Sequence, residues 1–435
     1  GRFRIHNRQD FADLSWLALS WEVSVDGVVR KRGRLPRRKT AAGQSEALTV
    51  PLPRLDWNPG EERHLTLRCV TARETPWAPR GHLVAWEQFE LPAPKRRSRS
   101  AAKGKQTARP LELEQSDRKA IVSGENFAVE IDKLQARLSG LGWRGLDVLA
   151  AGPRPNTWRG PTDNDGIKAF PVLPPKPLGK WLEWGLDRIE FQATACGVRR
   201  QKNGWVHVRL DSHATALDAE DDAESHLLRF TQHITVLPEG YIRLACQLRF
   251  GSALDDMPRA GIRFDLSHGF ERMEWFGRGP HESYWDRKEG AALARYAGIV
   301  DDQYHRYVVP QENGNKTDTR WLSLGRKEGE ALLIAGMAPM ECRVSHLDGA
   351  DLYAAGHLHE LRPRRETIVE LDWHQRGLGT GACGPDTLPA YRIGPGLHRL
   401  DVVLVPFDPN RTEPGALARS ARAAFGVPAA SRKRG

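Results

Sequence analysis

Cysteine is scarce in this sequence, with five residues in 435, and none lies in a C-x-x-C pair or at another short spacing. The five are Cys69, Cys196, Cys246, Cys342 and Cys383. An odd, widely spaced set argues against both a disulfide framework and a zinc knuckle. It favours a reducing compartment, and we expect a cytoplasmic protein.

Long hydrophobic runs are also missing. No stretch reaches the roughly 18 residues of a membrane span, and no apolar stretch follows residues 1–5 as in a signal peptide. Hydrophobic residues make up 40% and charged residues 28%, which is typical of a globular chain and excludes fibrous, membrane and disordered classes. The 435 residues are about three times the length of a typical domain, so we expect two or three domains.

The net charge of +10 is unevenly distributed, which argues against a nucleic-acid-binding core. Seven basic and no acidic residues lie between Lys95 and Arg109, and three more, Arg432 to Arg434, lie in the last four positions. These two segments supply the whole excess. Residues 93–118 contain few large apolar side chains and are predicted to be a flexible basic linker. Residues 411–435 are predicted to be a basic tail.

Helical periodicity is nearly absent, and short alternating runs dominate. Residues 1–92 show strands and a hairpin turn signal at Asp26-Gly27, which predicts a small β-sandwich. Strand patterns continue through residues 119–410, punctuated by Gly and Pro, and predict a second, unusually long all-β domain. The only candidate helix covers residues 417–425.

Several short motifs match a functional pattern in part but lack a residue or an element that the function requires. Residues 379–384 satisfy G-x-G-x-x-G, but Pro385 follows and no helix begins there, so a dinucleotide site is excluded. Residues 163–166 resemble the start of a calcium loop, but the twelfth position is Pro174 where a glutamate is needed. His357, His359 and His374 form no marked metal-ligand set, and we expect structural histidines. No G-x-S-x-G, H-E-x-x-H or Walker sequence occurs.

Carboxylates that could act in pairs, as glycoside hydrolysis requires, are plentiful. The candidates are Asp163, Glu282, Asp286, Asp301, Glu312 and Asp372. Sequence spacing does not pair residues across strands. The excess of 14 Trp over 7 Tyr favours a carbohydrate-related protein, since indole faces stack on sugar rings, although tryptophans are also ordinary core residues.

Longer motifs carry a family resemblance. They are NTWRGPTDND (156–165), MEWFGRGPHESY (273–284) followed by Asp286-Arg287, and YVVPQENG (307–314), with DLS (13–15), WEV (21–23) and GHLVAWEQ (81–88) in the first part. The sequence resembles the C-terminal portion of the large β-galactosidases of glycoside hydrolase family 2. The resemblance covers nearly everything except the basic linker and the last 25 or so residues.

The resemblance implies an immunoglobulin-like β-sandwich followed by a galactose-mutarotase-like β-supersandwich. It also implies that the acid/base glutamate, the nucleophile, the magnesium ion and a monovalent cation belong to a TIM barrel outside these residues. We therefore expect no catalytic residue, metal or cofactor in this chain, and no activity from it alone. The start at Gly1 without Met fits a fragment or subunit. The implied partners are a β-galactoside, the missing sugar-binding and barrel portions and further copies in a homo-oligomer, with no nucleic acid or membrane.

By motif position, the resemblance implies that Cys383 stands on a loop at the rim of the aglycone subsite, where some members carry Trp and others Cys. The alternative is a passive loop cysteine. Glu282, Asp286, Arg287, Glu312 and Asn313 are interpreted as structural hydrogen-bonding groups, with a vestigial or secondary sugar site as the alternative. For the whole chain, the rival hypothesis is a stand-alone carbohydrate-binding or mutarotase-like protein.

Overall fold

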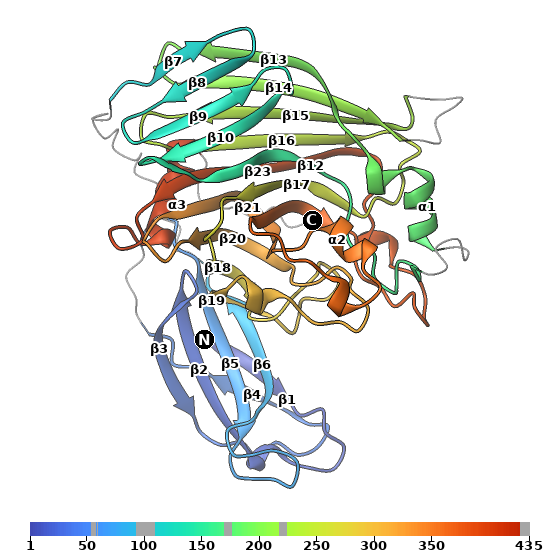
Figure 1. Ribbon diagram of the computed structural model, residues 1–435. Helices are drawn as coiled ribbons and strands as arrows, with labels where there is room; N and C mark the ends of the chain where they lie inside the picture. Colours follow the sequence, from blue (N-terminus) through green and yellow to red (C-terminus); the bar gives the residue numbers. More distant parts are fainter. Residues whose placement is uncertain (54–57, 59, 93–108, 169–175, 217–223, 427–435) are drawn as a thin grey trace. The chain divides into compact units, whose positions relative to one another are not determined.

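The computed structural model describes residues 1–53, 58, 60–92, 109–168, 176–216 and 224–426 (Figure 1). The chain divides into two compact units. The first comprises Gly1–Lys103 with Ala292–Arg295, and the second comprises Gly104–Ala291 with Tyr296–Gly435. Both are built mainly of antiparallel strands, which confirms the all-β class.

The first unit is a small β-sandwich, as the alternating pattern predicts. A four-stranded sheet in the order β3-β2-β5-β6 lies beside a two-stranded sheet, β1-β4. The strands are β1 (Arg2–His6), β2 (Leu17–Val25), β3 (Val28–Leu35), β4 (Ser45–Thr49), β5 (Arg63–Thr71) and β6 (Leu83–Glu90). Asp26 and Gly27 both have positive φ, 48° and 79°, as a two-residue hairpin turn between β2 and β3 requires.

The second unit contains two sheets around one large core. The smaller has the order β11-β10-β9-β8-β7, and the larger joins twelve strands. The strands of the smaller sheet are β7 (Glu112–Gln115), β8 (Lys119–Ser123), β9 (Phe127–Asp132), β10 (Arg137–Trp143) and β11 (Leu146–Asp147). Those of the larger sheet are β12 (Leu149–Asn156), β13 (Gln192–Arg200), β14 (Val206–Thr215), β15 (Leu227–Val236), β16 (Ile242–Phe250), β17 (Arg259–Leu266), β18 (Arg272–Gly279), β19 (Ala292–Ile299), β20 (Lys316–Gly325), β21 (Ala331–Ser345), β22 (Thr367–Gln375) and β23 (Gly396–Phe407).

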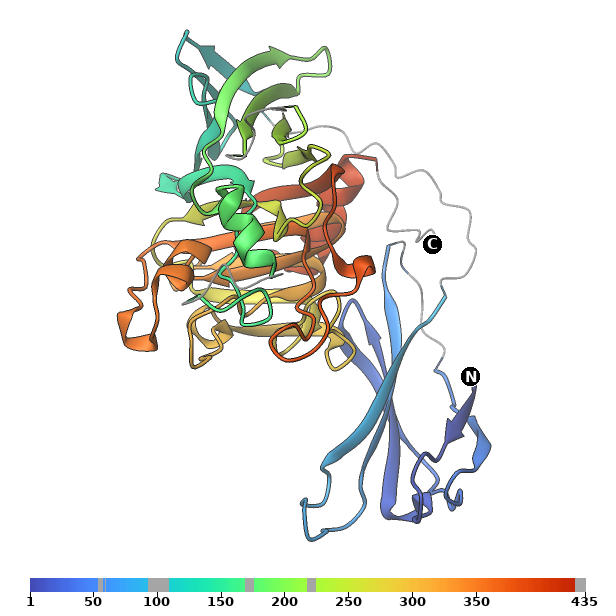
Figure 2. The same ribbon diagram turned by 90° about the vertical axis from the view of Figure 1, so that its right-hand side faces the viewer.

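Strands that are distant in sequence lie next to one another in the larger sheet. β16 pairs with β23 (Figure 1), and β17 lies between β12 and β22 in the strand order. Figure 2 shows the same fold turned by 90°. The alternation of apolar and polar residues in β15 and β16 gives strict alternation of buried and accessible positions. The loops that follow β17, β18 and β22 emerge from this rigid frame.

Three short α-helices complete the described residues: α1 (Pro177–Glu183), α2 (Gly349–Ala354) and α3 (Pro414–Ala424). The helix expected over residues 417–425 is thus present, but it is not part of a loose tail. Its Ala418 and Ala421 are fully buried in a core cluster with Phe276, Leu333 and Val405. Small side chains on one helical face let the helix pack closely on the sheet. No described helix is long and apolar enough to cross a membrane.

The expected linker also ends earlier than predicted. Residues 93–108 lie outside the described residues, but Glu112–Gln115 form strand β7, which pairs with β8. Leu111, just before this strand, is buried in the core of the second unit. Two leucines alternating with polar residues are too weak a pattern to separate a short edge strand from a linker.

Candidate functional site

The loop that carries Cys383 connects β22 to a 3-10 turn at Pro389–Tyr391. Positions 382–386 are exposed, and the Cys383 thiol is free. Of the five cysteines, Cys383 is the only exposed one, because Cys69 and Cys196 are partly buried and Cys246 and Cys342 are buried. A reagent or ligand in solution therefore meets this thiol first.

Two side chains from distant parts of the sequence hold the backbone of this loop. Asp286 accepts hydrogen bonds from the backbone N–H groups of Leu378 (3.0 Å) and Gly379 (2.8 Å). Asn164 donates to the carbonyl of Gly379 (2.9 Å) and accepts from the N–H of Ala382 (2.8 Å). The conformation of the loop is therefore set by groups outside it.

The glycines of the loop are required by close approach. Gly379 has φ +61°, and a Cβ there would lie 2.5 Å from the Oγ1 atom of Thr387. A Cβ on Gly381 would lie 2.7 Å from the Asn164 carbonyl oxygen. Any side chain at either position would force the loop away from its supports. The glycine pattern therefore serves a tightly held loop, and no helix follows it, as expected from Pro385.

A fully buried arginine anchors the base of the loop. Arg376 forms ion pairs with Asp256 (2.6 Å) and Asp386 (2.9 Å), and it donates to Thr387 Oγ1 (2.8 Å). Burial disfavours the ionised form of Asp386, but hydrogen bonds and charge from Arg376 outweigh this, so its pKa lies below the ordinary value. The backbone carbonyl of Arg376 in turn accepts a hydrogen bond from buried Arg159.

Aromatic side chains gather beside the Asp286 support, and sequence reasoning missed them. The Trp285 ring lies 3.9 Å from His374, 5.8 Å from Tyr391 and 6.2 Å from Trp373, measured between ring centroids. Trp285 comes directly before Asp286, so the same turn supplies the carboxylate that holds the Cys383 loop and the indole that packs against the neighbouring aromatic rings. In the sequence, only the adjacency of Trp285 to the motif residue Asp286 pointed to these aromatic side chains.

The motif carboxylate Glu282 is occupied by structural contacts. It accepts from the Tyr307 hydroxyl (2.5 Å) and the Gly314 N–H (2.9 Å), and it pairs with Arg287 (2.5 Å). These bonds join the two strongest motifs, residues 273–284 and 307–314. The interpretation of Glu282 and Arg287 as structural groups agrees with these contacts.

Glu312 belongs to a buried ionic network that runs beneath the motif loops. Arg259 pairs with Asp372 (2.9 Å), Glu370 (2.9 Å) and Glu312 (3.7 Å), and Arg343 pairs with Glu370 (2.9 Å) and Glu312 (3.6 Å). Burial raises the pKa of Asp372 to about 8 despite its bonds from Arg259. Burial has the same tendency at Glu370, but the charges of Arg259 and Arg343 outweigh it and hold its pKa at about 2.

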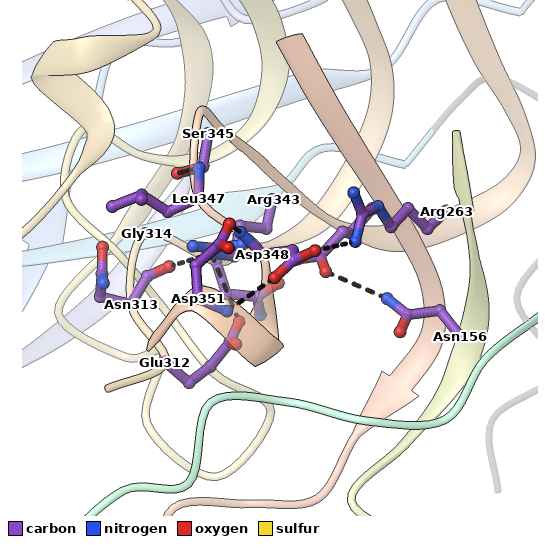
Figure 3. A network of polar contacts seen from close by, with 12 residues as sticks. Asn156, Arg263, Glu312, Asn313, Gly314, Arg343, Ser345, Leu347, Asp348 and Asp351 are labelled. Atoms are coloured by element: carbon purple, nitrogen blue, oxygen red, sulfur yellow. Dashed lines mark hydrogen bonds and ion pairs between the residues drawn. The ribbon is translucent and has the colours of Figure 1, made fainter. Parts of the chain in front are cut away.

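The network extends to helix α2 (Figure 3). Asn156 donates to Glu370 (3.1 Å), and Arg343 donates to the carbonyl of Asn313 (2.8 Å). At the helix, Asp348 accepts from the Asp351 N–H (2.8 Å) and also pairs with Arg263. Glu312, Asn313 and Asp372 are at most 2% exposed, so they form a structural core and leave no open sugar site at these residues.

The remaining candidates are dispersed. His357 and His359 stack with a ring separation of 5.5 Å on the surface, and His357 contacts Glu360, whereas His374 bonds to Glu341. Asp163 and Asp301 are exposed. Across the described ranges, no group of three or more His, Cys, Asp or Glu is arranged to hold a metal ion.

Both units match known families. Residues 123–404 match the family model described as the β-galactosidase small chain, and residues 3–92 match β-galactosidase domain 4. The two matches correspond, in chain order, to the small β-sandwich of the first unit and the larger β domain of the second. The chain belongs to the β-galactosidase small-chain family.

Curated relatives have the same name. A β-galactosidase of Priestia megaterium is 30% identical over 382 residues, which cover 87% of this chain and 35% of that protein. A β-galactosidase of Arthrobacter sp. is 28% identical, covering 90% of this chain and 38% of that protein. This chain thus spans about a third of the length of the curated relatives it matches.

Solved structures give a weaker likeness. An aldose 1-epimerase-like protein of Escherichia coli, described as putative, matches 68% of this chain and 99% of its own at 10% identity, with a TM-score of 0.35. A galactose 1-epimerase from Lactobacillus acidophilus gives the same TM-score at 11% identity. Scores at this level do not bear on function.

Proposed function

We propose that this chain is the C-terminal portion of a cytoplasmic β-galactosidase that hydrolyses terminal β-galactose residues from galactosides such as lactose. The observation that carries the proposal is the match of both units, in order, to β-galactosidase families. By resemblance, the reaction retains configuration through a covalent galactosyl intermediate formed on a barrel outside this chain.

This portion contributes the loop that presents Cys383 to the leaving-group side of the substrate. Support comes from the way the loop is held, because Asp286, Asn164 and Arg376 fix its backbone while its tip stays exposed. A small thiol offers less apolar area than an indole, so leaving-group sugars are bound weakly and less selectively than by relatives with Trp.

Magnesium and a monovalent cation are implied for the complete enzyme only. The described residues offer no cluster of three or more acidic, His or Cys side chains for an ion, so no ligand is assigned to this chain. The proposed partners are the sugar-binding and barrel portions of the enzyme and further copies in a homo-oligomer.

The test is hydrolysis of a chromogenic β-galactoside by the purified chain, alone and mixed with a barrel-containing N-terminal fragment of a β-galactosidase. We expect activity only in the mixture. Activity of the chain alone would show that its own carboxylates do chemistry. Inactivity in both would favour a stand-alone binding or mutarotase-like protein.

In the active mixture, Cys383→Trp tests the role of the loop. We expect the KM for galactosides with a sugar leaving group to fall, with a smaller change for a small aromatic leaving group, because only the former reaches across the rim. Cys383→Ser is the matched control. Equal kinetics for all leaving groups would remove Cys383 from the site.

A further inference from the structure

A cleft in the first unit is not explained by the proposed function. Its volume is about 800 Å³, and it lies between the segment before β2 and the loop between β5 and β6. Gln9, Asp13, Trp16, Arg73 and Trp77 are among its lining residues. This volume is within the range of small-molecule sites.

An exposed indole dominates the cleft. Trp77 is 62% exposed, although it is one of the largest apolar side chains of the unit. Trp16 and His82 make edge-type contacts with it, at centroid distances of 6.1 and 5.5 Å. These neighbours fix the orientation of the Trp77 ring and leave much of its surface uncovered. The exposed indole therefore offers the cleft an apolar face on which a ligand can stack.

The two segments that form the cleft are held by their own hydrogen bonds. Thr75 and Ala78 close a tight turn around Trp77, with the Thr75 N–H donating to the Ala78 carbonyl (2.9 Å). On the other side, buried Asn7 donates to the carbonyl of Ala12 (2.8 Å), and Asp13 accepts from the Ser15 N–H (2.8 Å). The cleft is therefore formed before any ligand arrives, which lowers the entropy cost of binding.

Polar groups of both kinds line the same cleft. The hydrogen bonds from Ser15 lower the pKa of Asp13, so its carboxylate is ionised at neutral pH and accepts hydrogen bonds. Arg73 is exposed and has no ion-pair or hydrogen-bond partner within the described residues. Gln9 supplies a neutral amide. Because Asp13 and Arg73 carry opposite charges, the cleft selects neither an anionic nor a cationic ligand. Its hydrogen-bond donors and acceptors together suit a ligand with hydroxyl groups.

We propose that this cleft binds a neutral pyranoside, with a C–H face of the sugar ring on Trp77 and its hydroxyls hydrogen-bonded to Asp13, Arg73 and Gln9. A pyranose has an apolar face and a polar rim, and the cleft offers an aromatic surface beside polar side chains. The proposal does not rest on the galactosidase assignment, since it concerns a site built wholly within the first unit.

Isothermal titration of the whole chain with lactose and, separately, cellobiose tests the proposal. We expect saturable binding of at least one sugar, with a Kd of about 1 mM. Trp77→Ala should weaken binding at least about tenfold, and Trp77→Phe should restore part of it, because an aromatic face is retained. Leu134→Ala in the second unit, where the side chain is 66% exposed and lies outside both sites, is the control and should bind as the parent does.

No saturable binding of either sugar would overturn the proposal, as would equal affinity in Trp77→Ala. Arg73→Ala provides an independent variant, since an exposed side chain contributes little to folding, and we expect it to weaken binding about threefold to tenfold. Unfolding curves of each variant check that the first unit is intact.

Discussion

The Cys383 loop and the Trp77 cleft are both exposed features built on loops, but different contacts hold them. The Cys383 loop depends on side chains from distant segments, among them Asp286 and Asn164, and on buried Arg376 at its base. The cleft is held by backbone bonds, with Thr75 and Ala78 paired within one loop and the Ala72 N–H donating to the Trp16 carbonyl across the two segments. Loss of one buried charge should therefore disturb the first feature, whereas loss of one surface side chain should leave the shape of the second unchanged.

Removal of Arg376 is expected to have the largest effect. Arg376→Met leaves Asp256 without its partner and removes a buried ion pair, so we expect the free energy of unfolding of the second unit to fall by about 3–5 kcal/mol. Urea unfolding measures the change. Arg392→Met is the control, because Arg392 also pairs with Asp386 (2.8 Å) but its side chain is 35% exposed, and its loss should cost under about 1 kcal/mol. Equal losses of unfolding free energy in the two variants would contradict the role of Arg376 as the buried anchor of the loop.

Lys316 tests the opposite case, a buried charge with no carboxylate within ion-pair distance among the described residues. Its ammonium donates to the Gly314 carbonyl (3.3 Å), and burial lowers its pKa from 10.5 to about 8. The folded state therefore binds fewer protons than the unfolded state between pH 8 and 10.5, and stability should rise with pH across that window.

Lys316→Met should abolish this rise and add about 3 kcal/mol to the free energy of unfolding at pH 7. Urea unfolding at a series of pH values measures both effects. Lys327→Met, at an accessible position, is the control and should change neither. An unchanged pH slope in Lys316→Met would show that the lysine keeps its ordinary pKa in the fold.

Asp286→Ala should have a smaller, local effect. The N–H groups of Leu378 and Gly379 lose their acceptor, at a cost of about 1–3 kcal/mol. Hydrogen exchange of these two amides should become roughly ten to a hundred times faster. Asp301→Ala removes an exposed carboxylate as a control and should leave both rates unchanged. Unchanged protection in Asp286→Ala would mean that the loop holds itself, as the segments of the cleft do.

The strands were predictable because apolar alternation is a local signal. The strand pattern predicted through residues 119–410 is seen in strands such as β9 and β15, and the Asp26-Gly27 turn forms as expected. β7 was not predicted because a four-residue edge strand with a single apolar residue, Leu113, resembles a polar linker. The pairing of β16 with β23 has no local signal at all, since it joins residues 146 to 162 positions apart.

The residues that hold the Cys383 loop were harder to predict from the sequence, because their contacts also join distant segments. Cys383 was identified only through family resemblance, and its supports are hydrogen bonds spanning 92 to 218 residues. In the sequence, Asn164 belongs only to the incomplete calcium-loop pattern at residues 163–166. In the structure, its side-chain amide forms hydrogen bonds with the backbone of the Cys383 loop. The exposure of Trp77 could not be foreseen, because a tryptophan in a strand-rich sequence is usually a core residue.

The most direct measurement is the rate at which a thiol reagent alkylates Cys383 in the complemented enzyme, with and without a saturating galactoside. Cys383 is the only exposed cysteine of the chain, so the rate is read from the mass shift of the Cys383 peptide. We expect the galactoside to slow the alkylation of Cys383 in the complemented enzyme and to leave its rate in the chain alone unchanged. Equal rates with and without galactoside in the complemented enzyme would contradict the placement of this loop at the substrate.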